Sequence, residues 1–236
     1  MDKTKQTSLL SPVFLGLGVV AMVLHRWLFT YVEDEIAWLL PAFTLPEILL
    51  WVLMAAAAIA AFVLTRRTVL RPEGKVFPAV SSVLMAGGIA TLLLENVTGP
   101  EVLVRIYHWL CIIAVPCLVA AAFYQGTGRK APFLLELPVC VMLVTQLLIC
   151  YQMWSEVPQL MNYVLGLGAV LCLTLAGFFR LAWAAGLPGK PWQNAVGLLG
   201  VFFCAAAVAQ GNFSWFFTAA AIWLANLYTG LRPAEG

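Results

Sequence analysis

Long runs of apolar residues recur along the whole chain and limit its fold more than any other feature. Each run is about 17–25 residues long, enough to cross a hydrocarbon core of about 30 Å at about 1.5 Å per residue. The runs are uniformly apolar rather than alternating, which excludes a lipid-facing β-barrel. The sequence therefore predicts an all-α fold, a polytopic integral membrane helical bundle of about eight transmembrane helices.

Turn residues and charges divide these runs into segments. The loops between them are short and leave no room for an extramembrane domain, so residues 1–236 form a single transmembrane helical-bundle domain. Only Gln210, Gly211 and Asn212 separate the last two runs, and whether residues 192–231 form two helices or a re-entrant hairpin stays open. We expect the helices near residues 12–30, 46–65, 77–97, 101–124, 132–154, 157–183, 192–209 and 213–231.

Composition indicates which partners surround such a chain. Apolar residues make up 63% of it and charged residues 10%, against about 45–50% and about 25% in ordinary soluble domains. A net charge of +2, spread over isolated basic pairs in loops, is too small for a nucleic-acid partner. The expected partner is the lipid bilayer, and a small-molecule ligand, a second membrane protein and a homo-oligomer remain open.

The distribution of basic residues predicts the orientation. With eight crossings, all Lys and Arg residues except Arg26 and Arg105 fall on one side, and most acidic residues fall on the other. The positive-inside rule assigns the basic side to the cytoplasm. Both termini are therefore expected to be cytoplasmic in a multi-pass protein of the cell membrane, specifically a bacterial cytoplasmic membrane.

Ionisable residues at membrane depth are costly, so they are functional candidates. Glu101, Arg105 and His108 follow the spacing of one helical face, and Arg105 is expected to lie inside the bundle, paired with Glu101 or Glu95. Together they predict an outward-facing polar vestibule, between the first four helices, that binds a small solute. Its other candidate residues are His25, Arg26 and Glu47.

Two other interpretations of these residues remain. They could form structural ion pairs whose long side chains reach the interface, or His25, His108 and a carboxylate could bind a metal. Because the spacing of the two histidines matches no metal-binding pattern, we predict no metal and no cofactor.

Glu136 stands apart from this group. It lies about one turn inside the cytoplasmic end of the segment at residues 132–154. A carboxylate there either caps the helix and reaches the interface, or serves as a proton or cation relay.

Motif searches leave the function open. The chain has no His-Glu-x-x-His, Gly-x-Ser-x-Gly or phosphate-binding glycine loop, so no catalytic residue is assigned and enzyme activity stays undecided. The preferred hypothesis is a small-solute transport or solute-binding component. The alternatives are an intramembrane enzyme acting on a lipid or lipid-linked substrate, with His108 as general base oriented by Glu95 or Glu101, and an accessory or sensor subunit.

Overall fold

A computed structural model describes residues 9–32, 44–70, 76–95, 99–129, 131–155, 163–187, 190–211 and 213–233. These ranges form eight α-helices, two 3-10 turns and one pair of short strands, so the predicted all-α class is confirmed. The helices are α2 (Leu10–Val32), α3 (Leu45–Thr65), α4 (Val76–Leu92), α5 (Glu101–Gly126), α6 (Phe133–Ser155), α7 (Val164–Ala184), α8 (Pro191–Ala207) and α9 (Ser214–Leu227).

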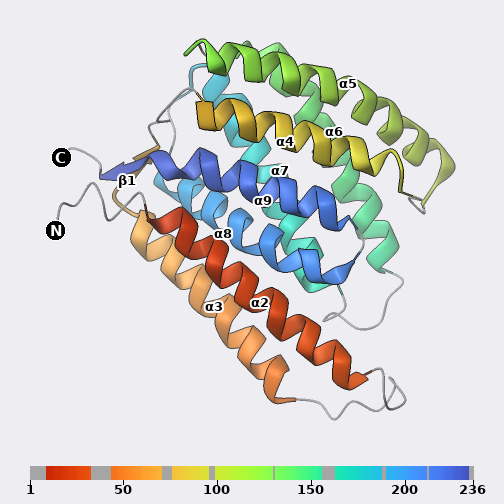
Figure 1. Cartoon of the computed structure of the whole chain (residues 1–236), viewed down its shortest axis with the longest axis vertical. Coiled ribbons are helices and arrows are strands. Elements are labelled where there is room, and N and C mark those ends of the chain that lie inside the picture. The colour runs from red at the N-terminus through yellow and green to blue at the C-terminus, as the bar shows by residue number, and fades with distance from the viewer. Residues whose placement is uncertain are drawn as a thin grey trace.

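Helices α8 and α9 form the centre of the bundle (Figure 1). Helices α2 and α3 pack on one side, chiefly against α8, and α4 packs on the other side against α9. Helix α5 covers α4, and α6 and α7 connect α5 back to α8. Most residues of α8 are buried, because other helices surround it.

Two three-residue strands close one end of the bundle, and we call this the hairpin end. Strand β1 (Thr68–Leu70) pairs antiparallel with β2 (Leu231–Pro233). The hydroxyl of Ser11, at the start of α2, donates to the carbonyl oxygen of Ala225, near the end of α9, at 2.7 Å. The beginning of α2 and the ends of α3 and α9 therefore meet at the hairpin end.

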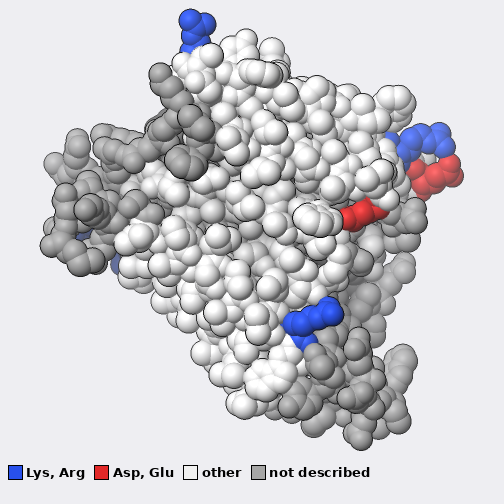
Figure 2. Space-filling model, viewed as in Figure 1, with Lys and Arg blue, Asp and Glu red and all other residues white. Residues whose placement is uncertain are grey.

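Six of the helices are long and apolar enough to cross a membrane: α2, α3, α5, α6, α7 and α8 extended by the 3-10 turn η2 (Val208–Gln210). Helices α4 and α9 are shorter, with 17 and 14 residues. The face in Figure 2 has a broad area without charged side chains, and the Lys, Arg, Asp and Glu residues in view lie toward its edges. The chain is therefore a multi-pass membrane protein.

Two predicted helix ends differ from the structure by more than two residues. The third helix ends at Leu92 rather than residue 97, because Leu93 and Leu94 turn with hydrogen bonds to carbonyls three residues back. The last helix ends at Leu227 rather than residue 231. The chain after it forms the 3-10 turn η3 (Tyr228–Gly230) and then β2. The sixth begins at Val164, and its predicted start at residue 157 lies outside the described residues.

Glycines allow the outer helices to approach the central pair. A β-carbon at Gly18 of α2 would lie 2.5 Å from the carbonyl oxygen of Phe202 in α8. A β-carbon at Gly88 of α4 would lie 2.6 Å from the β-carbon of Ala219 in α9. Small residues at these positions permit the close contacts that hold helices together in lipid.

Candidate functional site

A buried ion pair joins α6 and α7 near the hairpin end. Arg180 Nη2 lies 2.8 Å from Glu136 Oε1, and the two side chains are only 8% and 5% exposed. Glu136 occupies the first turn of α6, and Arg180 lies one turn before the end of α7, so these antiparallel neighbours bring both residues to the same level. An unpaired charge at this depth would cost several kcal/mol, and the pairing offsets part of that cost.

Gln125 connects this ion pair to α4 and α5. When its amide nitrogen faces α4, it donates to Ser82 Oγ at 3.0 Å and to the carbonyl oxygen of Pro78 at 2.9 Å, while its oxygen accepts from Arg180 Nη2. In this orientation each of these neighbouring polar groups forms a hydrogen bond with Gln125. The orientation of a side-chain amide is assigned on that basis. The guanidinium carbon also lies 4.7 Å from the ring centre of Trp223 in α9, within cation–π range. Arg180 therefore contacts residues from three other helices and, through Gln125, reaches a fourth.

A cavity of about 340 Å³ lies against Arg180 at the hairpin end. The amide nitrogen of Asn194 forms part of its wall and donates to the carbonyl oxygen of Thr68 at 3.0 Å, which fixes β1 to the start of α8. The ring of Tyr228 sits over Gly197, where a β-carbon would overlap it. The wall thus combines one guanidinium group, amides and aromatic rings, contributed mainly by Phe179, Arg180, Trp183, Gln193, Asn194 and Tyr228.

The structure confirms the predicted pairing of Arg105 but not its burial. Arg105 Nη2 lies 2.6 Å from Glu101 Oε1, as expected for residues four apart on a helix. The two side chains are 70% and 84% exposed, so the expectation that Arg105 lies inside the bundle was wrong. Its side of α5 faces outward, away from α4 and α6, so the pair avoids the desolvation cost that burial would impose.

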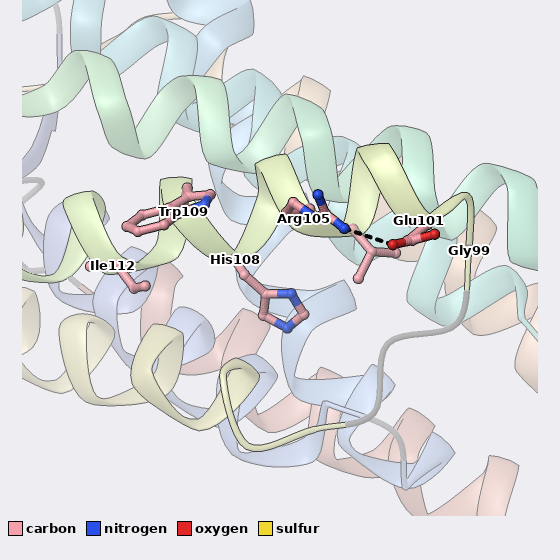
Figure 3. Close-up of a pocket in the computed structure, with 7 residues that line it drawn as sticks. Gly99, Glu101, Arg105, His108, Trp109 and Ile112 are labelled. Carbon is pink, nitrogen blue, oxygen red and sulfur yellow. Dashed lines mark hydrogen bonds and ion pairs between the residues drawn. The ribbon is translucent and has the colours of Figure 1, made fainter.

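His108 and Glu95 also lie at the end opposite the hairpin. His108 is half-buried and shares with Arg105 and Trp109 a groove of about 430 Å³ along the outside of α5 (Figure 3). Glu95 follows α4, where burial raises the pKa of its carboxyl and a hydrogen bond from the backbone of Phe213 opposes this. Glu95 thus interacts with the chain just before α9.

The remaining predicted residues lie on α2 and α3. His25 is buried within α2, and Glu47 is in the first turn of α3, where the positive end of the helix dipole favours an acid. Arg26 borders a second open groove, of about 620 Å³, together with Trp27 and the turn between α8 and α9.

The predicted residues therefore fall into two groups. Glu95, Glu101, Arg105 and His108 lie around α4 and α5, whereas His25, Arg26 and Glu47 lie on α2 and α3, with the central pair α8 and α9 between the groups. Glu101, Arg105 and His108 border one open groove, and Arg26 borders another. A ligand-binding role for these residues stays a prediction.

Sequence reasoning identified Glu136 and missed its partner. Arg180 was counted among the cytoplasmic interface charges, although it lies one turn inside its helix, as Glu136 does. Two opposite charges placed at the same depth of consecutive helices were the available signal. Nothing in the sequence singled out Gln125, Asn194 or Tyr228.

Within the described part of the chain, no group of three His, Cys, Asp or Glu residues could hold a metal ion. Comparison with known proteins adds no relative: no protein family, no curated protein and no solved structure matches the chain. The fold and the site define a multi-pass helical membrane protein with a buried ion pair beside a cavity.

Proposed function

We propose that this protein is a small-solute transport or solute-binding component of a membrane, and that the cavity at the hairpin end is its binding site. The observation that carries the proposal is Arg180, a buried cation in the wall of an open cavity of about 340 Å³. Ligand sites combine apolar walls with a few fixed polar groups, and this cavity has that composition.

The cost of burying charge supports a functional role. An apolar pair of similar volume would fill the same space with equal or greater stability. Charged groups inside membrane bundles characteristically mark solute or ion pathways. The location of Arg180 beside a cavity, rather than within a closed helix contact, distinguishes it from a purely structural pair.

The orientation that accompanies this proposal places the hairpin end in the cytoplasm, with eight helices crossing the membrane. Arg66, Arg67, Arg129 and Lys190 all lie near the hairpin end, whereas Glu47, Glu95 and Glu101 lie at the other. The positive-inside rule then assigns the cavity to the cytoplasmic side.

Blocking the cavity tests the proposal. Leu187 stands at the cavity wall and is 60% exposed, and Leu134 of α6 is 62% exposed and is absent from that wall. A panel of amino acids, organic acids, sugars and nucleosides would be screened for a rise in the melting temperature of the purified protein. We expect one class to raise it, Leu187→Trp to remove the effect, and Leu134→Trp to retain it.

Two results would contradict the proposal. One is that no class of solute stabilises the protein. The other is that a stabilising solute acts equally on the Leu187→Trp variant, because that solute would then bind elsewhere.

A further inference from the structure

The charges beside the cavity cancel one another. Glu136 neutralises Arg180, and both Glu136 and Gln125 contact the same guanidinium nitrogen, Nη2. A guanidinium group has five N–H donors, so Arg180 retains donors for a ligand in the cavity that it lines. An added anion would nevertheless give this buried site a net negative charge unless a proton accompanied it.

The rest of the wall indicates the body of the ligand. Phe179, Trp183 and Tyr228 contribute aromatic rings, and Leu70 and Leu227 contribute apolar side chains. A guanidinium group recognises carboxylate and similar planar oxyanions, while the rings favour an apolar or aromatic body. The lining therefore fits an organic anion better than an inorganic ion or a sugar.

Resting on the proposed function, we propose that the cavity binds a small organic anion with an apolar body, and that Glu136 takes up one proton when the anion replaces it on Arg180.

The exchange balances in charge. Before binding, the site contains one guanidinium cation and one carboxylate anion. After binding, it contains the guanidinium cation, the ligand anion and a neutral Glu136 carboxyl group that carries a proton from water. A buried carboxylate that has lost its cation takes up a proton, because remaining charged in a low-dielectric surrounding is far more costly. The site is neutral in both states.

The neighbours of Glu136 favour this exchange. Helix α6 packs against α5 and α7. Glu136 pairs with Arg180 from α7 and interacts electrostatically with Cys140 on its own helix, while Gln125 from α5 contacts Arg180. Tyr228 lines the cavity with Arg180 and interacts electrostatically with it. Gln125 and Trp223 hold the guanidinium group in place while its anionic partner changes.

The test uses the purified full-length protein with benzoate, benzenesulfonate and neutral benzamide as probes. Benzenesulfonate stays ionised at every pH used, so any proton taken up must bind the protein. Calorimetric titration in buffers of different ionisation enthalpy counts the protons that accompany binding. We expect about one proton per anion, and an affinity that rises about tenfold per unit decrease in pH between about pH 8 and about pH 6. Benzamide should bind at least about tenfold more weakly.

Two variants locate the proton. Glu136→Gln should bind benzenesulfonate without proton uptake and with an affinity independent of pH. Glu101→Gln, which removes an exposed carboxylate at the opposite end, should bind as the unaltered protein does.

Each other outcome identifies what has failed. Anion binding without proton uptake by the unaltered protein would overturn the exchange and leave the proposed function standing. Proton uptake that persists in Glu136→Gln would also overturn it. If neither anion binds while another solute stabilises the protein through the same cavity, the organic-anion class is wrong and the binding site remains. If Glu136→Gln does not fold, the number of protons taken up by the unaltered protein still tests the exchange.

Discussion

Two arginines of this chain each pair with a carboxylate, and their surroundings differ. Arg180 and Glu136 are buried, while Arg105 and Glu101 lie on the outside of α5. Exposed ion pairs contribute about 0–1 kcal/mol. Removing one partner of a buried pair costs roughly 3–5 kcal/mol, because the other charge is left uncompensated.

Arg180→Ala is therefore expected to lower the free energy of unfolding by about 3–5 kcal/mol. Arg105→Ala, the matched control, should change it by less than about 1 kcal/mol. Denaturation of the purified protein in mixed micelles measures both values. Equal losses in the two variants would contradict the assignment of Arg180 as the buried partner.

The double variant Arg180→Leu with Glu136→Leu separates structure from function. Replacing both partners with apolar residues removes the unpaired charge, so stability should return to within about 1–2 kcal/mol of the original. Solute binding should remain lost, because the cavity no longer has its cation. A double variant as unstable as Arg180→Ala would contradict the interpretation of the pair.

Depth along a helix was readable from the sequence, but direction around it was not. Glu136 and Arg180 were both recognisably one turn inside a span, whereas the outward side of Arg105 depends on which helices cover α5. Side-chain spacing placed Arg105 within reach of Glu101, but the expectation that Arg105 lies inside the bundle was wrong.

At the level of elements, paired glycines distinguish contact faces from lipid faces. Gly18 contacts α8 and Gly88 contacts α9, whereas a β-carbon at Gly16 or Gly87 would meet nothing within 4 Å. Gly18→Ala and Gly88→Ala should each destabilise the protein by about 1–3 kcal/mol, because the extra carbon forces the helices apart. Gly16→Ala and Gly87→Ala should leave stability unchanged or slightly raised.

Thermal unfolding of the four alanine variants checks this expectation. Gly16→Ala could destabilise the protein as much as Gly18→Ala does, or Gly87→Ala as much as Gly88→Ala. Either result would show that helix contacts do not control the loss of stability. Stability of Gly18→Ala equal to that of the unaltered protein would contradict the packing of α2 on α8.

Hydropathy located all eight helices but not all of their ends. The start of α5 at Glu101 was correct because Gly99 and Pro100 break the preceding chain. The ends of α4 and α9 were placed too late, because Leu93, Leu94 and Leu231 continue the apolar run after the helix has stopped. An apolar residue in a turn or a short strand is indistinguishable by hydropathy from one in a helix.

For the whole molecule, the sequence predicted a bundle but not which helices form its centre. Lipid and protein interior are similarly apolar, so composition does not separate central from peripheral helices in a membrane. The expectation of a site between the first four helices assumed that neighbours in sequence enclose a space together. In the described residues, α8 and α9 lie between the pair α2 and α3 and the pair α4 and α5, and they bring the end of the chain to Arg180 and the cavity.

The central claim is that the cavity beside Arg180 opens on the cytoplasmic side of a bundle that crosses the membrane. In a variant without native cysteines, Leu187→Cys places a thiol at the cavity wall, and Leu94→Cys places one at the opposite end, where the native side chain is 87% exposed. An impermeant thiol reagent added to intact cells should label Leu94→Cys and not Leu187→Cys, and inside-out vesicles should give the reverse. Labelling of Leu187→Cys from outside intact cells, or of both positions from the same side, would contradict the account.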